Sequence, residues 1–294
     1  MFTGEASAID LIQHSDLAMY QSKVAGRNRL RFFDPAVQTK VIALAALGND
    51  LRHALDPSQF ILYFQPQVNS QGHIVAAEAL LRWQHPERGL VSPSEFISLA
   101  EETELIIPIG IWVLQTACAQ LKTWGDMPVA RHLRLAVNVS ACQYRQDNFS
   151  QLVQQTLNAS AIDPSKLVLE VTESMMLDVP DAIGKMNALK AIGVTFSMDD
   201  FGTGYSSLAS LTQLPLSELK IDQSFVGRLV ERTSDAIIVR AIVAMGQALG
   251  LEVIAEGVET QEQRDILMRM SCQLFQGYLF SRPLPIGEFE GLLQ

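Results

Sequence analysis

Charged or amide residues stand near the ends of seven short apolar runs in this sequence. A strand that is buried on both faces consists almost entirely of apolar residues, so a polar group at its end is informative. These residues are Glu78, Asn138, Glu170, Asp199 with Asp200, Lys220 with Asp222, Glu256 and Gln276. If the runs are the strands of a barrel, their carboxyl ends converge on one face, which is where catalysis takes place in such folds.

Several carboxylates that share one space repel one another and raise one another's pKa. A divalent metal relieves this conflict, and carboxylate and amide oxygens without His or Cys suit hard ions such as Mg²⁺ or Mn²⁺. A cluster this rich suits two ions about 3.5–4 Å apart, as in phosphodiester-cleaving sites. The spacing alone leaves a buried ion-pair network open as the alternative.

Two neighbouring pairs of acids refine this expectation. Asp199 and Asp200 are adjacent, so a regular strand would turn them to opposite faces, and both reach one site only if the chain bends. Gly202 and Gly204 follow and tolerate positive φ, although an ordinary strand-to-helix turn also explains them. Glu173 lies three residues beyond Glu170 and therefore past the strand end, where it is better placed to hold a neighbouring loop than to bind metal.

Two cations accompany the acids. Lys220 either balances their charge in a salt bridge, or orients a water and stabilises charge on a phosphoryl oxygen. Arg82 lies four residues beyond Glu78, on the same side of the strand, where a guanidinium can grip phosphate with two hydrogen bonds. A surface arginine beside Trp83 is the alternative for that position.

The elements that must position these groups alternate between short apolar runs and amphipathic stretches. The predicted strands are Phe60–Val68, Ile74–Leu81, Leu133–Val139, Leu167–Val171, Val194–Met198, Glu218–Ile221, Leu251–Ala255 and Leu274–Tyr278. The predicted helices are Pro93–Thr103, Ile109–Trp124, Asp147–Ala159, Pro180–Ile192, Ser206–Leu211, Ser234–Leu249 and Thr260–Met270. Because only Asn69–His73 separates the first two strands, that pair is a hairpin and antiparallel. The pattern predicts an α/β fold, a (β/α)8 barrel with one irregular strand, and leaves an open doubly wound sheet as the alternative.

Composition narrows the classes of partner. The net charge is −10, from 22 basic and 32 acidic residues. No basic cluster stands out, so polymeric nucleic acid is disfavoured, whereas a small anion whose charge is met by bound metal is compatible. The three cysteines form no CxxC pair, and neither a bilayer-spanning run nor a signal peptide is visible, so we expect a cytoplasmic protein. A longer protein containing this chain can still be anchored to the membrane by other parts.

From about residue 50 onward the sequence resembles the EAL domain family. The tripeptide Glu78-Ala79-Leu80 alone is unspecific, but a long series of further motifs occurs in the family's order. They are Phe64-Gln65-Pro66, Asn138-Val139-Ser140, Glu170-Val171-Thr172-Glu173, Asp199-Asp200-Phe201-Gly202-Thr203-Gly204-Tyr205, Leu219-Lys220-Ile221-Asp222, Glu256-Gly257-Val258-Glu259 and Gln276-Gly277-Tyr278.

This resemblance implies a modified TIM barrel with one antiparallel strand and a phosphodiesterase that converts cyclic di-GMP to linear pGpG. It makes metal ligands of Glu78, Asn138, Glu170, Asp199, Asp200 and Glu256, which would hold Mg²⁺ or Mn²⁺, two ions in all. It places Lys220 near the attacking water, with Asp222 close to that lysine and the metals. It makes substrate contacts of Gln65, Arg82 and Gln276, and it gives Glu173 and Glu259 the task of bracing the loop after the fifth strand and the surroundings of the site. The family's motifs are complete here, which favours an active enzyme.

The N-terminal residues resemble a different family. Ser15-Asp16-Leu17-Ala18-Met19-Tyr20-Gln21-Ser22-Lys23, followed by Gly26-Arg27-Asn28-Arg29, is similar to the C-terminal tail of a GGDEF domain. We therefore expect a GGDEF remnant at residues 1–33, a linker helix within 34–57, from about Pro35 to Leu55, and an EAL domain at 58–294. The expected partners are the GGDEF and sensory domains of a longer protein and a second copy in a homodimer.

Two other functions remain open at this stage. A non-catalytic cyclic di-GMP receptor would bind the dinucleotide without metal and without turnover, and would signal to a partner. A barrel hydrolase for a different phosphodiester would keep the metal site and change the substrate.

Overall fold

The computed structural model describes residues 19, 46–55, 59–173, 175, 182–202 and 211–294. The chain divides into two compact units, residues 1–54 and 55–294. In the first unit residues 46–53 are helical, within the helix predicted from Pro35 to Leu55. Apart from Met19, the predicted GGDEF remnant at residues 1–33 lies outside the described residues.

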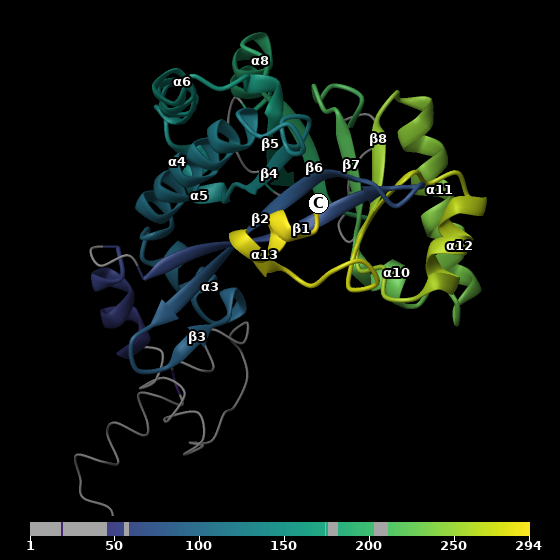
Figure 1. Cartoon of the computed structure of the whole chain (residues 1–294), viewed down its shortest axis with the longest axis horizontal. Helices are drawn as coiled ribbons and strands as arrows, with labels where there is room; N and C mark the ends of the chain where they lie inside the picture. The colour runs from purple at the N-terminus through teal and green to yellow at the C-terminus, as the bar shows by residue number, and fades with distance from the viewer. Residues whose placement is uncertain (1–18, 20–45, 56–58, 174, 176–181, 203–210) are drawn as a thin grey trace, which may run out of the picture. The chain divides into compact units, whose positions relative to one another are not determined.

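The second unit is built on a closed sheet (Figure 1). In the described part of the chain its ten strands are β1 (Phe60–Asn69), β2 (Ile74–His85), β3 (Gly89–Val91), β4 (Arg134–Asn138), β5 (Leu167–Thr172), β6 (Thr195–Phe201), β7 (Glu218–Ile221), β8 (Glu252–Ala255), β9 (Leu274–Gln276) and β10 (Leu284–Pro285). The hydrogen-bonded order is β10-β1-β9-β8-β7-β6-β5-β4-β2-β3, and β1 also pairs with β2. This extra pairing closes eight strands into a barrel and leaves β3 and β10 attached outside the ring.

The strand β1 runs against both of its neighbours in the barrel. It is antiparallel to β2 and to β9, whereas the pairs from β2–β4 round to β8–β9 are parallel. The four residues between β1 and β2 form a tight turn, in which the Asn69 side chain accepts hydrogen bonds from the backbone of Gln71 and His73. The predicted barrel with one antiparallel strand is confirmed, and its closure excludes the open doubly wound sheet.

Each of the eight predicted strands is present, but β2 is longer than the sequence suggested. It continues to His85 instead of ending at Leu81, and its last residues pair with β3. Trp83 explains the extension, because it is fully buried and packs against Phe60 and Phe96. Apolar packing therefore continues along β2 past Leu81, the end predicted for this strand.

Helices cover the outside of the barrel. The helical segments within the described residues are α3 (Pro93–Glu102), α4 (Ile106–Gly125), α5 (Ala141–Arg145), α6 (Phe149–Ser160), the 3-10 turn η1 (Pro164–Lys166), α8 (Ala182–Ala191), α10 (Gln223–Gly227), α11 (Thr233–Ala248), α12 (Gln261–Arg269) and α13 (Ile286–Gly291). Figure 1 shows α4, α6 and α8 on the side of β4 to β6, and α11 and α12 on the side of β8. In these residues no helix is long and apolar enough to cross a bilayer.

The short segments α5, α10, α13 and η1 were absent from the sequence prediction because one or two turns give no readable periodicity. Their start signals are local instead. Ser140 and Gln143 form a capping box at α5, and Asp222 caps α10 by accepting from the backbone N–H of Ser224. Apart from Leu211, the helix predicted at Ser206–Leu211 lies outside the described residues.

The amino-terminal end of the barrel holds a partly buried ion-pair network of three residues. Arg134 on β4 reaches Glu218 on β7, with 2.6 Å between Nη1 and Oε1, and Glu252 on β8, with 2.9 Å between Nη2 and Oε2. The Glu218 side chain is 2% exposed. This contact joins the base of β4 to the strands β7 and β8.

Candidate active site

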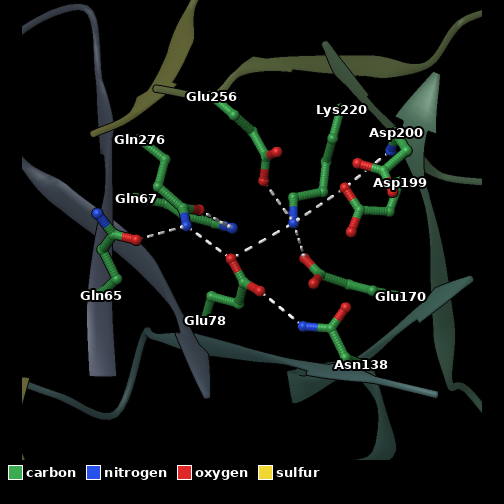
Figure 2. A network of polar contacts seen from close by, with 10 residues as sticks. All are labelled: Gln65, Gln67, Glu78, Asn138, Glu170, Asp199, Asp200, Lys220, Glu256 and Gln276. Carbon is green, nitrogen blue, oxygen red and sulfur yellow. Dashed lines mark hydrogen bonds and ion pairs between the residues drawn. The ribbon is translucent and has the colours of Figure 1, made fainter. Parts of the chain in front are cut away.

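A buried lysine lies among carboxylates at the carboxyl end of the barrel (Figure 2). Lys220, on β7, has no exposed surface. Its Nζ lies 2.6 Å from Glu256 Oε1, 2.8 Å from Glu170 Oε1, and 3.4 Å from both Glu78 Oε2 and Asp199 Oδ1. The carboxylates come from β2, β5, β6 and the residue after β8, so the fold brings together groups that are far apart in sequence.

Both carboxylate oxygens of Glu78 are held by amides. Asn138, at the end of β4, donates from Nδ2 to Glu78 Oε1 at 2.6 Å. Gln276, at the end of β9, donates from Nε2 to Glu78 Oε2 at 2.6 Å. The barrel therefore fixes the direction of this carboxylate from two sides.

Gln276 belongs to a buried trio of glutamines. Its Nε2 also donates to Gln65 Oε1 at 3.0 Å, and its Oε1 accepts from Gln67 Nε2 at 3.0 Å. Gln65 in turn donates to the backbone oxygen of Ser281 at 3.1 Å. The barrel register explains the grouping, because Gln65 is opposite Glu78 across β1–β2 and Gln67 is opposite Gln276 across β1–β9.

The carboxyl groups do not share one electrostatic environment. Burial raises the pKa of Glu170 well above its usual value, with the negative charge of Glu78 adding to the effect. Burial also raises the pKa of Glu256, to about 8, and the ammonium of Lys220 offsets only part of that shift. Burial acts in the same direction on Glu78, but Lys220 and the two amide donors outweigh it, so the Glu78 pKa is lowered. Burial opposes the charge of Lys220, yet the surrounding carboxylates raise its pKa well above normal. Lys220 and the two amides therefore favour the charged form of Glu78, whereas burial favours the neutral form of Glu170 and Glu256.

The expected bend at Asp199-Asp200 is present. The pairing of β6 with β7 shifts register between Met198 and Phe201, and Asp200 has a φ of 55°, in the left-handed region. The Asp200 N–H donates to Asp199 Oδ1 at 2.9 Å, which stabilises the bend. Burial, together with the nearby charges of Asp199 and Asp222, raises the pKa of Asp200 to about 6.

A cleft of about 270 Å³ opens above these groups. Its lining residues are Gln65, Glu78, Asp199, Asp200, Gln223, Glu256, Gly257, Glu259, Gln276, Gly277 and Tyr278. Eleven residues from strands β1, β2, β6 and β9, from the start of α10 and from the loops after β8 and β9 thus enclose one polar space. The lining of the cleft includes five acids. An anionic ligand would therefore bind there only together with added positive charge.

Arg82 and Glu173 are not among the residues that line this cleft, whereas Glu259 is. Arg82 is half-buried on β2, where Nη1 donates to the Leu81 carbonyl and the guanidinium lies 5.5 Å from the Tyr63 ring centroid. Glu173 lies just past β5 and is 6% exposed, with no hydrogen-bond donor for either carboxylate oxygen among the described residues. Glu259 is exposed and lines the cleft, whereas most of the loop that Glu173 and Glu259 are expected to brace, residues 203–210, lies outside the described part.

The donor set fits hard metal ions in its chemistry. Among the described residues no three acidic, histidine or cysteine side chains stand in a ready-made metal geometry, since Lys220 lies between the carboxylates. Four carboxylates nevertheless share one ammonium, and the buried Glu170 Oε2 accepts no hydrogen bond there. Such oxygens are the ligands that Mg²⁺ and Mn²⁺ prefer, and added cations would complete the charge balance.

Comparison with known proteins agrees with this geometry. Residues 48–283 match the family described as EAL domain. This chain is a member of the EAL domain family.

Two curated relatives show how an EAL domain of this kind occurs in longer proteins. The chain is 45% identical over 278 residues to MucR of Pseudomonas aeruginosa, named a bifunctional diguanylate cyclase/cyclic di-GMP phosphodiesterase. The matched region covers 94% of this chain but only 40% of MucR. It is 38% identical over 281 residues to the cyclic di-GMP phosphodiesterase PdeR of Escherichia coli, covering 95% of this chain and 42% of PdeR. The chain therefore spans less than half the length of these two relatives.

A solved structure extends the similarity to three dimensions. The structure titled PaMucR phosphodiesterase, c-di-GMP complex, is 45% identical and superposes with a TM-score of 0.80, covering 83% of this chain and 99% of that one. By its title, that structure is of a phosphodiesterase in complex with cyclic di-GMP. The EAL fold expected from the sequence is thereby confirmed.

The sequence prediction missed some uncharged residues of the candidate site. Gln67, Gln223 and Tyr278 are the clearest, since Gln67 joins the glutamine trio and the other two line the cleft. Gln67 had a usable signal, because it lies two residues after Gln65 and strand residues two apart share a face. Gln223 begins the short helix α10 and Tyr278 follows the end of β9, and in both places periodicity gives no direction.

Proposed function

We propose that this EAL domain is a phosphodiesterase that hydrolyses cyclic di-GMP to linear pGpG with two Mg²⁺ or Mn²⁺ ions. The observation that carries the proposal is the cluster of four carboxylates around Lys220 at the catalytic end of the barrel. The similarity to the MucR domain that binds cyclic di-GMP selects the substrate.

The metal ligands we propose are Glu78, Asn138, Glu170, Asp199, Asp200 and Glu256. When bound, the ions supply a Lewis acid for the phosphate and lower the pKa of a water molecule. Asn138 would offer its amide oxygen, and the Asp199-Asp200 bend allows two consecutive residues to face one site. The substrate contacts we propose are Gln65, Arg82 and Gln276.

The chain's own residues carry the proton and charge transfers. Lys220 orients the attacking water and stabilises negative charge as it develops on the phosphoryl oxygens. Glu256, 2.6 Å from Lys220 Nζ, or one of the aspartates, accepts the proton of that water. The new bond joins the water oxygen to phosphorus, the bond from phosphorus to the 3′-oxygen breaks, and the 3′-oxygen takes up a proton as it leaves. From the family resemblance, we propose that Asp222 acts close to Lys220 and the metals.

Product analysis with purified protein and Mn²⁺ tests the proposal. We expect cyclic di-GMP to disappear and pGpG to accumulate, with a Glu78→Ala variant at background. If pGpG does not exceed that background while calorimetry in EDTA still detects cyclic di-GMP binding, the domain is a receptor and not an enzyme. If the domain cleaves another phosphodiester and unlabelled cyclic di-GMP does not inhibit that cleavage, the substrate assignment is wrong.

The wider organisation stays a prediction. We propose a cytoplasmic homodimer in which residues 1–33 continue a GGDEF domain, residues 34–57 contain a linker helix and residues 58–294 form the EAL domain. The GGDEF and sensory domains of a longer protein would then be its partners.

A further inference from the structure

One buried side chain touches the proposed catalytic machinery without belonging to its predicted residues. Gln67 lies on β1 and is 2% exposed, and Figure 2 shows it beside Gln276 inside the barrel. Its Nε2 donates to Gln276 Oε1 at 3.0 Å. A buried polar side chain costs free energy unless it is hydrogen-bonded, so this contact accounts for its place in the core.

The two ends of the Gln276 amide have different tasks. Its Nε2 donates to Glu78 at 2.6 Å and to Gln65 at 3.0 Å, and its Oε1 accepts from Gln67. A glutamine amide has a nearly symmetric shape but opposite polarity at its two ends. Turned over, Gln276 would aim an oxygen at the Glu78 carboxylate, and two acceptors would face each other.

The backbone of Gln276 does not determine which of the two orientations its side-chain amide adopts. It is fixed by β1–β9 pairing, in which Gln67 and Gln276 are opposite, and by the Val258 N–H, which donates to the Gln276 carbonyl at 3.0 Å. Gly277 allows the close approach, since a Cβ there would lie 2.2 Å from the Val258 oxygen. What remains free is the terminal torsion of the Gln276 side chain, which is broad and roughly two-fold.

We propose that Gln67 is a positioning residue that sets the orientation of the Gln276 amide, so that Gln276 donates to Glu78 and holds the carboxylate of Glu78 in place for metal. This inference rests on the proposed function for its metal and substrate. Gln67 Nε2 donates to the Gln276 oxygen, so a turned Gln276 amide would place two N–H groups against each other. Outer partners that orient metal ligands change metal affinity or activity by about 10–100-fold when they are replaced.

The test compares Gln67→Met, which keeps the length and removes the donor, with Gln84→Met, the same change at an exposed position on β2. The first readout is the Mn²⁺ concentration that half-saturates the thermal shift, measured without substrate. The second is kcat and KM for cyclic di-GMP. We expect Gln67→Met to raise the half-saturating Mn²⁺ concentration about tenfold and to lower kcat by a similar factor, with KM also raised because Gln276 is a proposed substrate contact. Gln84→Met should match the wild type in both readouts.

A double-mutant cycle separates positioning from general damage. In a Gln276→Met background, Gln67→Met should add less than about twofold, because the group through which it acts is gone. An unchanged tenfold effect in that background, or equal Mn²⁺ half-saturation for Gln67→Met and Gln84→Met, would overturn the proposal. If Gln67→Met fails to fold, Gln67→Leu takes its place, since it is also apolar and has no group that can donate.

The two proposals fail in different ways. A wild-type domain that binds Mn²⁺ but leaves cyclic di-GMP intact refutes the proposed function, while the Mn²⁺ half-saturation still tests Gln67. A wild-type domain that makes pGpG, with a Gln67→Met variant indistinguishable from it, refutes only the role of Gln67.

Discussion

The ammonium of Lys220 lies 2.6 Å from Glu256, its shortest distance to any of the four carboxylates that surround it. Replacing Lys220 by Met keeps the aliphatic stem and removes the charge. Breaking a buried ion pair costs about 3–5 kcal/mol, so the variant should unfold at lower denaturant concentration in EDTA. Mn²⁺ should reduce the difference in stability between the two proteins because the ions return positive charge to the same carboxylates. The kcat of the variant should fall at least about 100-fold.

Equilibrium denaturation of the wild type and of Lys220→Met, each in EDTA and in Mn²⁺, measures the two effects on stability, and the rate of cyclic di-GMP hydrolysis measures the fall in kcat. A stability gap that is the same in EDTA and in Mn²⁺ would contradict a shared metal and lysine site.

Metal removal should change the stability of the wild type itself. A ligand at 100 times its Kd stabilises the folded state by about 2.7 kcal/mol, so saturating Mn²⁺ should raise the melting temperature by several degrees over EDTA. Glu170→Gln should lose most of this shift, since one oxygen of the buried Glu170 carboxyl accepts no hydrogen bond among the described residues. Scanning calorimetry checks this, and an identical melting temperature in EDTA and Mn²⁺ would show that the cluster does not bind the ion.

The base of the barrel predicts a pH-dependent stability. Burial raises the pKa of Glu218, and Arg134 partly offsets the rise. A carboxyl whose pKa is higher in the folded state takes up its proton more readily there, so its contribution to stability falls as pH rises from its unfolded pKa through its folded pKa. Arg134→Leu removes the offset, so this fall should become steeper and extend to higher pH, with about 3–5 kcal/mol lost at neutral pH.

Urea unfolding of Arg134→Leu between pH 5 and 8, in EDTA, gives the slope. Adding Glu218→Gln to that variant removes the titrating group and should restore most of the lost stability. A double variant with the same pH slope as Arg134→Leu would assign the titration to another residue.

Asp222 allows its structural and electrostatic roles to be separated. Its side chain caps α10 through the backbone N–H of Ser224, at 3.0 Å. Asp222→Asn retains the cap, whereas Asp222→Ala loses it and should cost about 1 kcal/mol. If the carboxylate acts in hydrolysis, both variants should lose activity to the same extent while only Asp222→Ala melts earlier. Activity kept by Asp222→Asn would leave Asp222 with the cap alone.

The sequence was sufficient to predict the ring of eight strands because each strand is a short apolar run and nearly every strand ends near a polar residue. The hairpin of β1 and β2 followed from the short spacing between them. The extension of β2 to His85 was not predictable, because it depends on Trp83 meeting Phe60 and Phe96 across the fold.

The charged part of the candidate site was visible as residue types at strand ends, whereas its internal arrangement was not. Lys220 lies between Glu78, Glu170, Asp199 and Glu256 because side chains from separate strands point into the same part of the barrel. That arrangement depends on the three-dimensional ring and cannot be read from residue spacing. The same holds for Gln67, whose importance comes from facing Gln276 across a strand pair that joins positions 209 residues apart.

The ring closes through β1, which is the first of its strands to leave the ribosome, and β9, which is the last. Until Leu274–Gln276 has been synthesised, β1 and β8 each present an unpaired edge. At about 5–20 residues per second, the more than 200 residues between the two strands take roughly 10–40 seconds to synthesise. The nascent chain thus keeps open sheet edges for that time, and such edges are templates for aggregation. Chaperone dependence during synthesis should end only when the β9 segment emerges.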